Sequence, residues 1–149
     1  MAEPKRDFAT EERIQSAETE LGVTFPAELK AIWRVHNCNE LPGGWRFFPV
    51  FDPSNPRKTA GAVTYENLRG AWGKRIRALG LIALASNGTG NHLVARVVEG
   101  SVEPLVLHWH HETERLTPWK PGLASVLKAA RKSADAMDRL RARFAPGKA

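Results

Sequence analysis

The densest group of potential metal ligands in this sequence is a short run that contains His108, His110, His111 and Glu112. On a β-strand, His108 and His110 would share one face and could supply two ligands. His111 and Glu112 are expected to lie beyond the end of that strand. Two ligands are too few for a site, and a third would have to come from another segment: His92, His36 or Asp52. We therefore predict a strand end with solvated imidazole rings and no bound metal.

A glycine-rich segment, Asn87-Gly88-Thr89-Gly90-Asn91, is the second candidate for chemistry, because such loops can cradle a phosphate. The P-loop pattern ends in Gly-Lys-Ser/Thr and opens a helix, whereas here Asn91-His92 leads into an apolar strand pattern. A hairpin turn that needs positive φ at its glycines explains the same residues. We predict such a turn and no cofactor.

Catalysis by a nucleophile or by paired carboxylates has little support in the sequence. Cys38 is the single cysteine, and neither a nucleophile elbow nor a Cys-His signature surrounds it. One cysteine also excludes an internal disulfide and a cysteine-based zinc cage. Glu18 and Glu20 fall on different faces of the helix expected there. We therefore predict that the protein is not an enzyme and has no catalytic residues.

The positive charge is concentrated at the C-terminal end of the chain. The formal net charge is +6, and residues 128–148 contain seven Lys or Arg against two Asp, which accounts for five of these charges. A basic helix of this kind can bind nucleic-acid phosphates or an acidic protein. No aromatic residues alternate with the basic ones as platforms for base stacking. A solvated helix face or an acidic protein partner is therefore favoured over nucleic acid.

The five tryptophans are the other candidates for an interface. Trp33 and Trp72 occupy predicted core positions of helices, whereas the other three lie at strand ends or in loops, where an indole can stay partly exposed. A core position is favoured for each tryptophan taken alone, but an exposed Trp beside Arg is a common interface anchor. Trp45 next to Arg46 is the leading candidate. The predicted partner-binding residues are Trp45, Arg46, Trp109, His110, His111, Arg139 and Arg143.

Periodicity and capping signals predict four helices. Thr10 can cap a first helix that Gly22 ends, and Pro26 can open a second that ends near His36-Asn37. Thr64 can cap a third, with Tyr65, Leu68 and Trp72 on its apolar face. A last helix after Pro121-Gly122 carries apolar residues at steps of three and four for about six turns: Leu123, Val126, Leu127, Ala130, Ala134, Met137, Leu140 and Phe144.

Strand-like segments lie between these helices, at residues 46–52, 81–85, 93–98, 105–110 and 116–119, with loops at 38–45 and 52–61. Pro49 lacks an N–H, which predicts an edge position or a bulge for the first strand. Helices followed by a meander and another helix indicate an α+β fold without parallel βαβ units. The length of 149 residues suits one domain. No apolar run is long enough to span a membrane, and the charged N-terminus lacks a secretory signal, so we expect a cytoplasmic protein.

Three segments together resemble the SUKH superfamily, the group that includes the yeast cell-wall-synthesis regulator. They are IQSAETELGVTFPAELKAIWRVHN at 14–37, LIALASNGTGNHLVARV at 81–97 and PLVLHWHHE at 104–112. The chain departs from the family pattern in three places. Cys38-Asn39 replaces a glycine after His36-Asn37, Asn87 replaces an acidic residue before the hairpin glycine, and the basic tail after residue 130 lies outside the pattern.

The resemblance implies an α+β domain whose mostly antiparallel sheet is flanked by two N-terminal helices and a long C-terminal helix. Residues 1–149 would form this one domain, with the basic extension 128–144 packed on it or projecting from it. Bacterial members are frequently immunity proteins encoded beside polymorphic toxins, such as contact-dependent or type VI-delivered effectors. On this resemblance we predict an intracellular protein that neutralises a cognate toxin by steric occlusion. A regulatory or scaffold module and a nucleic-acid-binding protein are the alternatives, and the oligomeric state stays open.

Overall fold

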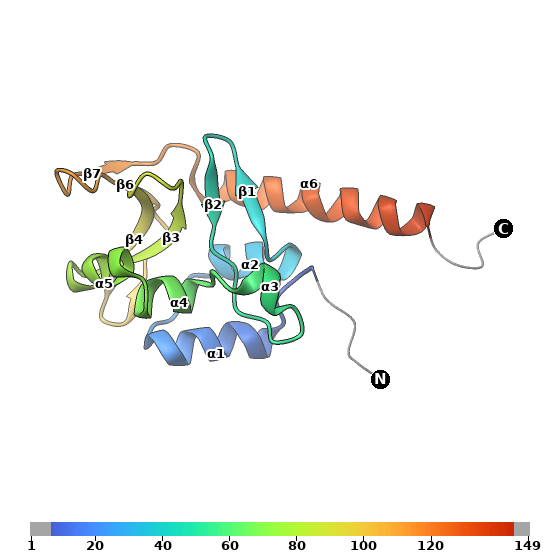
Figure 1. Cartoon of the computed structure of the whole chain (residues 1–149), viewed down its shortest axis with the longest axis horizontal. Helices are drawn as coiled ribbons and strands as arrows, with labels where there is room; N and C mark the ends of the chain where they lie inside the picture. Colours follow the sequence, from blue (N-terminus) through green and yellow to red (C-terminus); the bar gives the residue numbers. More distant parts are fainter. Residues whose placement is uncertain (1–6, 145–149) are drawn as a thin grey trace.

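The structure of the protein is a computed structural model that describes residues 7–144. Residues 1–6 of the charged N-terminal stretch, on which the expected lack of a secretory signal rests, lie outside these residues, as does Lys148. Figure 1 shows a sheet surrounded by helices and one long helix, α6, that runs past the edge of the sheet. The predicted α+β class is confirmed.

The two N-terminal helices are those predicted from the capping signals. In α1 (Glu11–Leu21) the Thr10 side chain accepts a hydrogen bond from the Arg13 N–H at 3.4 Å, and Gly22 ends the helix with φ 66°. The second helix, α2 (Ala27–Val35), follows Pro26 and buries one apolar face in the core. The Glu18 carboxylate joins the two helices, because it accepts from the Phe25 N–H at 2.8 Å and pairs with Lys30.

The sheet has seven strands, and every pair of neighbours is antiparallel. Their order is β1-β2-β3-β4-β6-β7, with β5 pairing only with β4. The bounds are β1 (Asn39–Leu41), β2 (Trp45–Phe47), β3 (Leu81–Ser86), β4 (His92–Val98), β5 (Ser101–Val102), β6 (Leu107–Trp109) and β7 (Leu116–Pro118). The mostly antiparallel sheet expected from the resemblance is therefore confirmed, and β1 is one of its edges.

The first strand is shorter than predicted, and it belongs to a hairpin that the sequence did not reveal. β2 ends at Phe47, before Pro49, and the predicted loop 38–45 contains β1 and a turn in which Gly43 and Gly44 have φ values of 87° and 76°. Beyond Pro49 the chain is held by a side-chain amide instead of a strand partner. Asn37 donates to the Val50 carbonyl at 2.8 Å and accepts from the Val50 N–H at 2.9 Å.

The single helix predicted after Thr64 is wrong. The chain instead forms two helices, α4 (Val63–Leu68) and α5 (Ala71–Ala78), and Gly70, with ψ 138°, separates them. A further short helix, α3 (Pro56–Thr59), lies within the predicted loop 52–61. Gly73 packs so closely on α4 that an added Cβ would lie 1.7 Å from the Glu66 carbonyl oxygen. Because the helix is interrupted at Gly70, the side chains expected on one buried apolar face do not all point into the core. Three side chains expected in the core are exposed by 39% to 55%: Tyr65, Leu68 and Trp72.

Strand pairing divides the central side chains between two faces of the sheet. Phe47, Ala85, Leu93 and His108 are successive partners across four strands and therefore share a face. The Trp33 ring of α2 lies on this side, 6.5 Å from the Phe47 ring. The opposite face lies under α4 and α5, and it carries the neighbouring residues of these strands: Ser86, His92 and Trp109.

The last helix, α6 (Gly122–Arg143), is packed at its start and projects at its end. Leu123, Val126 and Ala130 are buried against α2 and the sheet, and no residue of α6 after Ala130 is buried. Figure 1 shows this second part extending beyond β1. We call residues 131–143 the α6 extension. Within residues 7–144, no helix combines the length and the apolar composition that crossing a bilayer requires.

Candidate partner-binding surfaces

The structure buries two of the predicted interface residues. The side chain of Trp109 is 0% exposed and that of Trp45 is 7% exposed, so both occupy the core position favoured for each tryptophan taken alone, and neither has the partial exposure that an interface anchor needs. Helices cover both faces of the sheet, which places these strand positions inside the core. Of the three tryptophans expected at strand ends or in loops, only Trp119 is half-buried. Neither Trp45 nor Trp109 offers an indole surface to a partner in this conformation.

Trp109 belongs to a group of aromatic rings that we call the His/Trp cluster, formed by Trp72, His92, Trp109 and His111. The Trp72 ring lies 6.0 Å from Trp109 and 5.2 Å from His111, and His92 lies 6.1 Å from Trp109. The Arg75 guanidinium lies above both indoles and pairs with Glu114 at 2.6 Å. The cluster therefore joins α5 to β4 and to the turn after β6.

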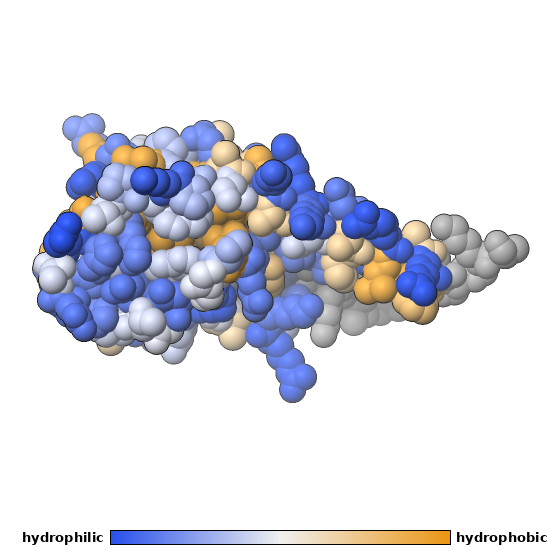
Figure 2. Space-filling view, turned by 90° about the horizontal axis from the view of Figure 1, so that it is seen from above, coloured by the Kyte–Doolittle hydropathy of each residue, from blue (hydrophilic) through white to orange (hydrophobic). Residues whose placement is uncertain are grey.

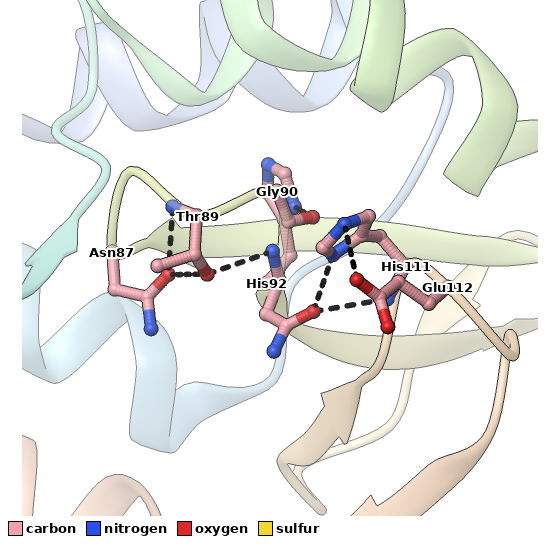
Figure 3. A network of polar contacts seen from close by, with 7 residues as sticks. Asn87, Thr89, Gly90, His92, His111 and Glu112 are labelled. Atoms are coloured by element: carbon pink, nitrogen blue, oxygen red, sulfur yellow. Dashed lines mark hydrogen bonds and ion pairs between the residues drawn. The ribbon is translucent and has the colours of Figure 1, made fainter.

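The turn between β3 and β4 is closed by its own polar side chains (Figure 3). The Asn87 carboxamide oxygen accepts from the Thr89 hydroxyl at 2.6 Å and from the Thr89 N–H at 3.2 Å. Gly88 and Gly90 have φ values of 83° and 97°, which confirms the predicted turn. The side-chain oxygens of Ser86, Asn87 and Thr89 are thus engaged by groups of the turn itself.

His111 and His92 have structural partners in the same network. The His111 ring donates through Nδ1 to the Asn91 carboxamide oxygen at 2.7 Å, and His92 donates through Nδ1 to the Gly90 carbonyl at 2.8 Å. Burial lowers the pKa of His92, and the nearby His111 lowers it further, whereas the Gly90 carbonyl opposes this shift. His92 is therefore held as a neutral ring that fixes the turn against β6.

His108 in β6 and His110, directly after its end, lie on one side of the chain, as predicted, but their rings face each other. Their rings stack at 4.1 Å with an angle of 8° between planes, while Trp45 meets His108 edge-on and His110 hydrogen-bonds to the Thr117 hydroxyl. Burial and the neighbouring His110 both lower the pKa of His108. Because the ligating lone pairs lie in the ring planes, parallel stacked rings do not direct them toward one ion. Residues 7–144 contain no group of three or more His, Cys, Asp or Glu that could hold a metal.

The predicted arginines remain at the surface. Arg46 donates to the Gly61 carbonyl at 3.1 Å and to Glu66 at 3.3 Å, and its guanidinium lies 5.0 Å above the Phe48 ring. Arg139 and Arg143 are exposed on the α6 extension. The residue between them, Arg141, forms an ion pair with Asp7 at the other end of the described chain. These arginines therefore lie on two parts of the surface, the β2 strand near the edge of the sheet and the α6 extension, and of them only Arg46 lines the depression between the two.

That depression is a groove of about 700 Å³ between the α6 extension and the edge of the sheet. We call it the α6 groove. The helix contributes four residues to one wall: Ser133, Ala136, Met137 and Leu140. The facing wall comes from Asp7, the segment around Cys38, β1, β2 and α3, and it includes His36, Glu40, Arg46 and Lys58. The predicted residue Arg46 is thus brought to this groove, while His110 and His111 lie elsewhere.

The sequence model of the SMI1/KNR4 family (SUKH-1) matches residues 9–127, which is most of the chain. The chain belongs to this family. The suspected SUKH resemblance is therefore confirmed, and the match includes both N-terminal helices and the whole sheet. No curated protein matches the chain.

The SUKH-1 match ends inside α6, before the α6 extension begins. One wall of the α6 groove is therefore built by residues that the family model does not cover. Sequence reasoning missed the groove residues Met137, Leu140, Lys58 and Cys38. A signal was present for Met137 and Leu140, because the apolar stripe of the last helix continues for about three turns beyond Ala130, the last residue of α6 that is buried.

Proposed function

We propose that this protein is an immunity-type binding protein that neutralises a cognate toxin inside the cell that makes both. Membership of the SUKH-1 family carries the proposal. Members of this superfamily commonly act by binding, as immunity or regulatory proteins. The chemistry of residues 7–144 agrees with a binding role, because the histidines and the glycine-rich turn are engaged in structural contacts and not directed at a substrate.

Neutralisation would follow from steric occlusion of the toxin's active site or substrate channel. The surface charge favours a toxin with an acidic face, since the chain carries a net charge of +6 and its α6 extension is strongly basic. Complementary charges raise the rate of encounter more than they raise the final affinity. Arg139 and Arg143, both exposed, are the predicted residues that would contribute to this steering.

The direct test is co-expression with the product of the adjacent gene. We expect that product to inhibit growth alone, and this protein to restore growth and to co-elute with it as a stoichiometric complex. The double variant Arg139→Glu/Arg143→Glu should slow association by about tenfold at low salt and by less at high salt. Growth that is not restored, together with the absence of a complex, would count against an immunity role.

The basic α6 extension also defines the experiment that separates this role from nucleic-acid binding. Electrophoretic mobility shifts with duplex DNA and with RNA should show no complex at about 150 mM salt if the partner is a protein. Salt-dependent binding that disappears in Arg139→Ala/Arg143→Ala would replace the immunity proposal with the nucleic-acid alternative.

A further inference from the structure

The α6 groove combines apolar and basic surfaces that no described part of the chain covers. Leu140 is 47% exposed, and Met137 lies one turn before it on the same wall. A volume of about 700 Å³ holds the equivalent of about 20 water molecules, which an apolar occupant would release. Figure 2 shows hydrophobic and strongly hydrophilic residues side by side on the part of α6 that projects from the body.

The position of the α6 extension is set by few contacts. After Ala130 the helix leaves the core, and an ion pair joins Arg141 of the extension to Asp7, which lines the facing wall of the groove. A helix that keeps an apolar stripe for three turns beyond its own core presents an unpaired surface of the kind that marks an interaction site. In this structure the apolar side chains of Met137 and Leu140 already line the groove.

The charges around the groove favour an acidic partner segment. The α6 extension contains five Lys or Arg against two Asp, a net charge of +3, and Lys58 adds an exposed cation on the facing wall. The charges of the facing wall cancel, since Arg46 and Lys58 stand against Asp7 and Glu40, so the excess positive charge beside the groove is that of the extension. A partner segment with apolar side chains for Met137 and Leu140 and with carboxylates for the basic rim would match both features.

We infer that the α6 groove seats an acidic segment of the partner protein, with apolar side chains that pack on Met137 and Leu140. This inference deepens the proposed function and rests on it, because the partner is the toxin proposed above. Since the family match ends before the extension, the groove would give this chain a selectivity that the matched region alone does not provide.

The same features disfavour two other occupants. A nucleic acid would bring phosphates to the basic rim but would leave the apolar wall unmatched. A second copy of this chain in a symmetric contact would place two extensions of net charge +3 against each other. Both remain outcomes that the experiment below would detect.

The single cysteine gives a direct probe of occupancy, because Cys38 lines the groove. Burial raises the pKa of its thiol, so alkylation by N-ethylmaleimide would be followed at about pH 8.5. With the purified product of the adjacent gene as the probe, we expect Cys38 to react at least about tenfold more slowly in the complex. Leu140→Asp should weaken the affinity by about 10-fold to 100-fold.

Leu105→Asp is the matched control, because Leu105 is also an exposed leucine, at 58%, and does not line the groove. It should leave both the affinity and the protection of Cys38 unchanged. A complex that forms equally well with Leu140→Asp and leaves Cys38 reactive would overturn the groove inference while the proposed function stands. Protection of Cys38 by RNA, or by self-association in sedimentation experiments, would overturn it as well.

A second arm keeps the inference testable if the adjacent gene product does not bind and the proposed function fails. A displayed library of random peptides would be selected on the full chain and counter-selected on Leu140→Asp. Enriched peptides that combine Asp or Glu with large apolar residues, and that slow the alkylation of Cys38, would support the groove inference. Enrichment of Lys-rich or Arg-rich peptides, or of peptides that bind both proteins equally, would overturn it.

Discussion

The His/Trp cluster at the centre of the sheet and the α6 extension at its edge contrast in how their side chains are used. The cluster holds two of the histidines considered as metal ligands in the sequence, His92 and His111, together with the indoles of Trp72 and Trp109. In the structure these rings contact one another, and the Nδ1 atoms of His92 and His111 are hydrogen-bonded within the turn. The extension holds alkyl and guanidinium groups of no special reactivity, but they are exposed along an open groove.

This contrast shows that residue type is a weaker guide to function than environment. A histidine whose ring is buried and hydrogen-bonded stabilises a turn, whereas a leucine beyond the end of the core becomes a candidate contact. The two regions should therefore respond oppositely to substitution. Changes in the cluster should lower stability, and changes in the extension should alter partner binding while the fold remains.

The largest effect is expected for Trp109→Ala. Trp109 is fully buried, and its indole N–H makes no hydrogen bond within the described residues, so its contribution to stability comes from packing and from the Arg75 guanidinium above its ring. Its loss should reduce the free energy of unfolding by about 3–5 kcal/mol, measured by urea denaturation. Trp72→Ala is the matched control, because Trp72 is 39% exposed and should cost clearly less. Equal losses for the two variants would contradict the assignment of Trp109 to the core.

The next effect is expected for Gly90→Ala. Gly90 has φ 97°, and an added Cβ would lie 3.0 Å from the His111 ring, so the substitution should cost about 1–3 kcal/mol. Gly88→Ala is an informative control, because Gly88 has φ 83° with open space around its Cβ position. The difference between the two unfolding free energies measures the contact with His111. If the two variants lose the same stability, the turn is not fixed by that contact.

A smaller effect is expected from pH. Because burial lowers the pKa of native His92 below its ordinary value, the unfolded chain binds a proton below about pH 6.5 that the native ring does not. Stability should therefore be fully present above this pH and should fall as the pH decreases toward the lowered native pKa. The same direction holds for His108.

Urea denaturation at several pH values between about 5 and 8 would measure this slope. His92→Gln removes one titrating ring and should flatten the dependence, and His92→Gln/His108→Gln should flatten it further. A wild-type stability that does not change over this range would show that neither ring is held neutral by its surroundings.

The elements that could be predicted from the sequence are those with local signals. Thr10 and Gly22 marked the ends of α1, and the alternation in residues 93–98 marked β4. The turn at Gly88 and Gly90 was predicted because the need for positive φ is a property of a few adjacent residues. The shared face of His108 and His110 followed from the period of a strand.

The features that could not be predicted depend on contacts between distant segments. The strands β1 and β2 have three residues each, too few to show alternation, and the break between α4 and α5 depends on the close approach at Gly73. The burial of Trp109 depends on α5, which covers it. The α6 groove brings together Asp7, residues 36–58 and residues 133–140, so no single stretch of sequence contains it.

The smallest effect on stability is expected for Leu140→Ser, and it distinguishes the two regions most directly. Leu140 is 47% exposed on a part of α6 in which no residue is buried, so the free energy of unfolding should change by less than about 0.5 kcal/mol. The substitution should nevertheless weaken partner binding, because it removes an alkyl group that belongs to the apolar wall of the groove. Urea denaturation and binding measurements on the same preparation would separate the two quantities. A loss of stability comparable to that of Trp109→Ala would mean that the extension is part of the core, and the contrast between the two regions would then disappear.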